Sequence, residues 1–190
     1  DPAIIDSDTG TGTIKDDGTA ATDGNNDGII DNDKPTLTIS DATVEEGSAA
    51  VFDVSLDKPT EAPWEVSFAT ALGTAEAGDI DTPLVVTYVD SSSVTQTLTP
   101  DANGKYTVPA GVTTLSVSVP TTNDDVYEGP ETFTLSANVT NPAITDTDTG
   151  LGTIKDDGTA TDGDDTGTTI DNDKPSFSVG DVSISEGGLM

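Results

Sequence analysis

The chain has 190 residues and a formal net charge of −30, because six Lys and no Arg stand against 36 Asp and Glu. A surface this negative repels nucleic acids and anionic membranes, so neither is an expected partner. There is no Cys and no His, which excludes disulfides, Ser-His-Asp and Cys-His catalysis, and His-ligated zinc. Acid of this density opposes compaction unless a hard divalent cation neutralises it.

A repeat of constant spacing organises the chain. Residues 2–18 return at 142–158, and residues 31–35 return at 171–175, in both cases 140 residues later. The spacing predicts a 140-residue unit, present once in full and in parts of two neighbouring copies. We therefore expect a piece of a longer array in which domains stack in a line and contact mainly their neighbours.

The first 34 residues are predicted to hold the end of one repeat and a linker. Residues 1–17 correspond to the last strand of the preceding repeat, and residues 18–34 form an acidic linker. Residues 23–28 read Asp-Gly-Asn-Asn-Asp-Gly, the opening of an EF-hand-type calcium loop. The loop is incomplete, since position twelve is Lys34 and not a bidentate Glu.

The candidate calcium ligands of this linker follow from the EF-hand positions one, three and five. They are Asp23, Asn25 and Asp27, with Asp31 or Asp33 as a substitute for the missing Glu. The alternative interpretation is a flexible, soluble spacer.

The complete repeat, expected at residues 35–157, carries the strand signals. Apolar and small polar residues alternate with a period of two, as a half-buried antiparallel strand requires. The alternating segments are residues 36–40, 52–56, 64–68, 115–119 and 133–137, with 84–88, 95–98 and 152–154 as further candidates. Pro and Gly separate them, and residues 101–104 are expected to be a hairpin loop. The predicted fold class is all-β, an immunoglobulin-like antiparallel β-sandwich with acidic interdomain linkers.

Acidic clusters lie in the loops between these strands. Loops from alternate strand ends gather at one pole of a sandwich. Four acidic loops there would repel one another when empty and would offer a cage of six to eight oxygens to Ca²⁺. The clusters are Glu45-Glu46-Gly47, Gly78-Asp79-Ile80-Asp81, the segment 124–128 and Asp156-Asp157. Taken singly, each also fits an ordinary polar loop.

The chain ends with a second linker and a further partial repeat. Residues 158–174 keep Asp162 and Asp164 but have Thr166 where the first linker has Asp27, so the calcium signal is weaker there. Residues 175–190 are expected to form the first strand of the next repeat.

The same acidic segments resemble the Calx-β motif. The resemblance is carried by Val44–Gly47, by residues 73–79, by the run Asn-Asp-Asp-Val-Tyr-Glu-Gly-Pro-Glu-Thr-Phe at 123–133, and by Gly-Thr-Ile-Lys-Asp-Asp at 152–157. It implies an immunoglobulin-like sandwich with calcium at one end. The implied ligands are Glu46, Asp79, Asp124, Asp125, Glu128, Glu131, Asp156 and Asp157. Asp81 is the alternative to Asp79, because the region after Asp79 is longer than a minimal domain needs.

The tandem, acidic, Cys-free and Arg-free character resembles the extender region of giant RTX-type adhesins of Gram-negative bacteria. This implies an extracellular or cell-surface structural repeat that binds Ca²⁺, contacts neighbouring repeats of the same chain, and supports cell adhesion and biofilm formation. As a separate fragment it is expected to be monomeric, without direct membrane contact. The alternative is a calcium-dependent carbohydrate- or surface-binding module, for which Trp64 would have to be exposed. Catalysis by a carboxylate pair is the third hypothesis, and we predict that the chain is not an enzyme.

Overall fold

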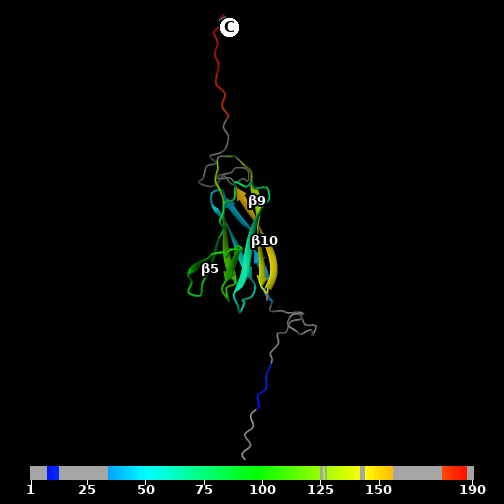
Figure 1. Cartoon of the computed structure of the whole chain (residues 1–190). Coiled ribbons are helices and arrows are strands. Elements are labelled where there is room, and N and C mark those ends of the chain that lie inside the picture. Colours follow the sequence, from blue (N-terminus) through cyan, green and yellow to red (C-terminus); the bar gives the residue numbers. More distant parts are fainter. Residues whose placement is uncertain are drawn as a thin grey trace, which may run out of the picture.

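In the computed structural model, the described residues are 8–12, 34–124, 126, 128–141, 144–155 and 177–187. They contain strands and no helix, and the strands form two five-stranded sheets. The sheets pack face to face, with β5 in one layer and β9 and β10 side by side in the other (Figure 1). The predicted fold class, an all-β sandwich, is confirmed.

The first sheet has the strand order β1-β3-β8-β5-β6, and the second has the order β2-β10-β9-β4-β7. All neighbouring strands are antiparallel except β2 and β10, which are parallel. The strand bounds are β1 Leu37–Ile39, β2 Ala42–Glu45, β3 Ala49–Leu56, β4 Trp64–Leu72, β5 Val85–Val89, β6 Thr95–Leu98, β7 Lys105–Val108, β8 Thr114–Pro120, β9 Glu131–Asn141 and β10 Ile144–Lys155.

The core forms where the inward-facing side chains of the two sheets meet. Along β3, Ala50, Phe52, Val54 and Leu56 are buried, while the residues between them face outward. Trp64 and Phe133 are fully buried as well, and the rings of Phe52 and Phe133 meet edge to face with centroids 5.8 Å apart. The alternation read from the sequence is therefore the alternation of burial in the sandwich.

Two strands were missed by the sequence analysis. Residues 42–45 were assigned only to an acidic motif, but they form β2 at the edge of the second sheet. Residues 105–108 form β7, which pairs with β4. The turn expected at residues 101–104 is present, since Gly104 N donates a hydrogen bond to the Asp101 carbonyl. It does not close a hairpin, however, because β6 and β7 belong to different sheets.

The polypeptide enters and leaves the sandwich at opposite ends. Leu37 at the start of β1 lies opposite Leu56, the last residue of β3. Lys155 at the end of β10 lies opposite Glu45, near the start of β3. We call the end with Leu37 and Leu56 the entry pole, and the end with Glu45 and Lys155 the exit pole.

The segments outside the sandwich are only partly described. Residues 8–12 and 177–187 belong to neither sheet, so their assignment to neighbouring repeats stays a prediction. The linker ligands predicted at residues 23–33 lie outside the described residues. Within the described part of the chain, no helix is long and apolar enough to span a bilayer.

Candidate metal centre

Three loops meet at the exit pole, and backbone hydrogen bonds hold them together. The β2–β3 turn is tied to β10, because Glu46 N donates to the Lys155 carbonyl at 2.8 Å. It is also tied to the β8–β9 loop, since both the amide and the hydroxyl of Thr121 donate to the Ser48 carbonyl, at 3.2 and 2.6 Å. Gly47 allows this approach: its φ is +72°, and a Cβ there would lie 2.9 Å from Cβ of Asn123.

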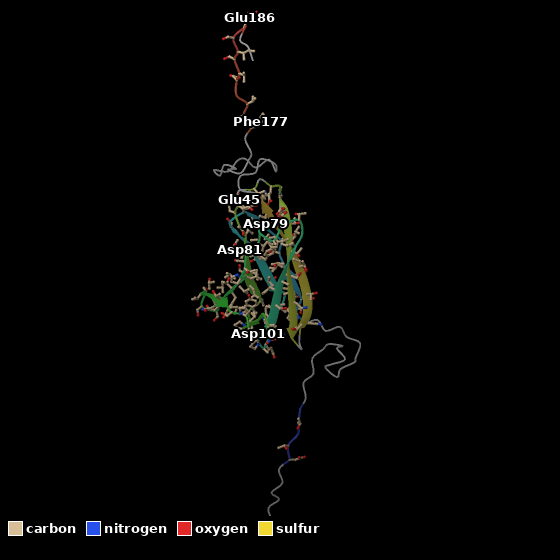
Figure 2. The ribbon with its side chains drawn as sticks, turned by 45° about the horizontal axis from the view of Figure 1, so that its top comes forward. Glu45, Asp79, Asp81, Asp101, Phe177 and Glu186 are labelled. Carbon is tan, nitrogen blue, oxygen red and sulfur yellow. The ribbon has the colours of Figure 1, made fainter. Side chains whose placement is uncertain are left out.

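The β4–β5 loop docks against both ends of the β8–β9 loop. Gly73 N and Ala75 N donate to the Thr132 carbonyl at 2.9 and 3.0 Å. Thr122 N donates to the Asp79 carbonyl at 3.0 Å, so Asp79 lies beside the other end of the β8–β9 loop. In Figure 2, Glu45, Asp79 and Asp81 all lie toward this end of the sandwich.

Three carboxylates from these two loops and the start of β9 lie together. One oxygen each of Asp79, Glu128 and Glu131 lies within 4.8 Å of the other two. Asp79 is only 7% exposed, and the other two side chains are half-buried. Oxygens on opposite sides of one Ca²⁺ lie about 4.6–5.2 Å apart, since each Ca–O bond is about 2.3–2.6 Å. The spacing therefore fits a single calcium ion.

The electrostatics of the cluster disfavour a full set of charges. Burial raises the pKa of Glu131 to about 7, and a hydrogen bond from its protonated form to Asp79 acts in the same direction. The negative charges of Asp79, Glu128 and Glu76 raise it further. At neutral pH the metal-free cluster therefore shares a proton at Glu131, and a bound cation would displace it.

Asp79 is held in place by its own loop. Its carboxylate accepts a hydrogen bond from Glu76 N at 2.5 Å, and its amide donates to the Glu76 carbonyl at 3.4 Å. Glu76 is the acidic neighbour that the sequence analysis missed, although it lies within the segment 73–79 that resembles the Calx-β motif. Its acidic side chain in an already acidic loop was the available signal.

The predicted ligands divide into three groups. Asp79, Glu128 and Glu131 are brought together, and Asp79 rather than Asp81 takes part in the cluster. Glu46 and Asp124 lie in loops at the same pole but are not members of this three-carboxylate group. The Oε2 atom of Glu46 is shielded from solvent, and Asp124 Oδ1 accepts a hydrogen bond from Val126 N at 2.7 Å.

The remaining predicted ligands lie outside the described residues, and their roles stay predictions. They are Asp125, Asp156 and Asp157 of the domain-end cage and Asp23, Asn25, Asp27, Asp31 and Asp33 of the first linker. Asp156 and Asp157 directly follow Lys155, whose carbonyl lies at the exit pole.

Comparisons with known proteins give matches among solved structures. No protein-family model and no curated protein matches the sequence. The chain is similar to CBD12 from CALX1.2, with 22% identity and a TM-score of 0.45 over 66% of this chain. It is also similar to the apo-form Calx CBD1 domain, with 21% identity and a TM-score of 0.43 over 64% of this chain and 98% of that one.

The calcium binding domain CBD12 of CALX1.1 is similar as well, with 21% identity and a TM-score of 0.43 over 65% of this chain. The chain spans 45% of the length of each of the two CBD12 structures that it matches.

Proposed function

We propose that the chain is a calcium-stabilised structural extender repeat of an extracellular bacterial surface adhesin. Its role is to project the adhesive part of that protein and to stiffen the chain for cell adhesion and biofilm formation. The observation that supports this most is the position of the carboxylate cluster. Asp79, Glu128 and Glu131 gather at the pole where the polypeptide leaves the sandwich toward the second linker.

Calcium at this place would act on the junction between repeats. Asp79, Glu128 and Glu131 would hold the ion, and Glu46, Asp124, Asp125, Asp156 and Asp157 are the proposed source of the remaining oxygens. The ion neutralises carboxylates that otherwise repel one another, which favours the packed arrangement of the loops. Because Asp156 and Asp157 open the linker, the same ion would restrict the angle between one repeat and the next.

The extracellular setting follows from the expected affinity. Modules of this kind bind Ca²⁺ with dissociation constants of about 10⁻⁴–10⁻³ M, which matches calcium levels outside cells and not inside them. The chain would therefore stay loosely folded during export and would become rigid when it meets calcium. The opposite positions of entry and exit suit a linear array of such repeats.

Small-angle X-ray scattering tests the proposed stiffening. The material is the chain lengthened by one 140-residue unit, so that two complete repeats flank one linker. Millimolar Ca²⁺ is expected to increase the maximum dimension and to narrow the distance distribution relative to chelator, and Mg²⁺ is not. A variant with Asp79→Asn and Glu131→Gln at the first exit pole should respond less. Identical profiles with Ca²⁺ and with chelator would refute the proposal.

The ligand-binding alternative depended on an exposed Trp64, and the structure does not favour it. Trp64 is fully buried, and its Nε1 donates a hydrogen bond to the Val112 carbonyl at 3.2 Å. Its ring is part of the core and offers no platform to a sugar.

A further inference from the structure

Three aspartates connect the first strands of the sandwich to its last strand. Leu37 N and Ile39 N of β1 donate hydrogen bonds to Oδ2 of Asp146 and of Asp148 on β10, at 2.9 and 2.7 Å. In the opposite direction, Leu151 N of β10 donates to Oδ1 of Asp41 at 2.8 Å. We call Asp41, Asp146 and Asp148 the bridging aspartates.

The bridges from Asp146 and Asp148 run between the two sheets. β1 belongs to the first sheet and β10 to the second, so the two backbones do not form a common ladder. The residues that alternate with Leu37 and Ile39 pair with β3: the Thr36 carbonyl accepts from Asp57 N, and Ser40 N donates to the Asp53 carbonyl. The amides of Leu37 and Ile39 therefore face the open edge of β1, where the carboxylates reach them.

Beyond the bridges, the chain continues along β10 as a parallel pair. Residues 42–45 of β2 lie opposite residues 152–155 of β10, and the Glu46 amide adds a bond to the Lys155 carbonyl. The fit is close where the segment changes sheets. A Cβ on Gly150 would overlap the Ser40 carbonyl oxygen and would lie 2.7 Å from Cγ2 of Ile39. Residues 37–46 are thus attached to β10 along their whole length.

The internal repeat retains the bridging acids where it changes other residues. In the partial copy at 176–186, nine of the eleven residues 36–46 are replaced, and only Asp41 and Glu46 return unchanged, as Asp181 and Glu186. The partners of the other bridges also return, with Asp6 and Asp8 preceding Asp146 and Asp148 by 140 residues. An acid that served only solubility would not need to hold its register.

The direction of strain decides what these contacts can resist. A pull on the two ends of the module draws β1 out at the entry pole and β10 out at the exit pole. β2 and β10 are parallel, so the pull slides them past each other in opposite directions. Their hydrogen bonds, together with the three carboxylate bridges, are then loaded side by side and must break together. Bonds peeled from one end would break one at a time.

We infer that β1, β2 and β10 form a mechanical clamp, in which the bridging aspartates resist forced separation of the module ends. This function rests on the proposed role as an extender, which places the repeat under tension between a cell and its target. The clamp itself is built from carboxylate-to-backbone bonds, which are stronger than neutral ones, and it needs no metal ion.

Single-molecule pulling on the whole chain tests the clamp. The chain has no Cys, so one Cys added at each end gives unique attachment points. The variant carries Asp146→Ala and Asp148→Ala. Its unfolding under constant load in chelator is expected to be about 100-fold faster than that of the parent chain, at about tenfold for each charge-assisted bond.

A matched control removes two carboxylates that lie off this path. Oδ1 of Asp90 accepts the amides of Ser92 and Val94, and Oδ1 of Asp101 accepts those of Asn103 and Lys105. Asp90→Ala with Asp101→Ala should lower stability in urea, yet leave the unfolding rate under load within about threefold of the parent. Equal rates under load for the two double variants would overturn the clamp.

Two further measurements keep the result interpretable. If the double variant does not fold, Asp148→Asn replaces it, with a smaller expected acceleration of about tenfold because the amide oxygen is a neutral acceptor. A pull between Cys at Ser91 and the C-terminal end bypasses β1, and the acceleration should then disappear. All of these rates are measured without calcium, so they stand or fall separately from the calcium-dependent scattering.

Discussion

Replacement of Glu131 by Gln is expected to shift thermal stability in opposite directions with and without calcium. Glu131 is a half-buried carboxylate whose pKa is raised to about 7 by burial and by neighbouring acids. At pH 8 it is mostly ionised and repels Asp79, Glu128 and Glu76. Gln removes this charge, and its amide can donate to Asp79 as protonated Glu131 does. In chelator, the variant should therefore melt at a higher temperature than the parent.

With calcium the order should reverse relative to the gain from the ion. For a dissociation constant of about 10⁻⁴–10⁻³ M, about 10 mM Ca²⁺ stabilises the parent by about 1.4–2.7 kcal/mol. For a domain of this size this corresponds to a rise of about 5–15 °C in Tm. Loss of one carboxylate from a cluster of three should weaken binding about tenfold, which removes about 1 kcal/mol of that stabilisation.

Differential scanning calorimetry at pH 8, in chelator and in Ca²⁺, measures both effects. Glu61→Gln is the matched control, because Glu61 is an exposed acid in the loop between β3 and β4, at the entry pole. It removes the same charge far from the cluster and should leave the calcium-induced rise unchanged. An equal rise for the parent and for Glu131→Gln, or an equal rise with Mg²⁺, would refute the proposed site.

Three other predictions concern pH and packing. Because the folded-state pKa of Glu131 is raised from 4.5 to about 7, its contribution to metal-free stability is complete below about pH 4.5 and is lost as the pH rises through about 7; urea unfolding in chelator should show this fall, and calcium titrations over the same range should show affinity rising with pH. Gly152→Ala should cost about 1–3 kcal/mol in urea unfolding, since its Cβ would overlap the ring of Phe133, whereas Gly78→Ala has open space around it and should be near neutral. Trp64→Ala should cost about 3–5 kcal/mol, because the ring is fully buried, and the smaller cost of Trp64→Phe is read from the same urea curves.

The strands were predictable where their burial pattern is local. Residues 52–56, 64–68 and 133–137 alternate in the sequence, and their inward side chains are the core of the sandwich. β2 and β7 were missed because each has only four residues, so its alternation is brief. The acids next to β2 also pointed to a metal motif, and that interpretation hid the strand they follow.

The sequence by itself determined the repeat, the all-β class and the clustering of acids between strands. A constant offset and a period of two are one-dimensional properties that need no partner to be seen. Tertiary structure alone decided that Asp79, and not Asp81, faces Glu128 and Glu131, and that Asp41, Asp146 and Asp148 bind backbone amides instead of solvent. These choices depend on contacts between residues about 50 or 110 positions apart. Only the pairing of strands sets which carboxylates meet each other and which meet an open strand edge.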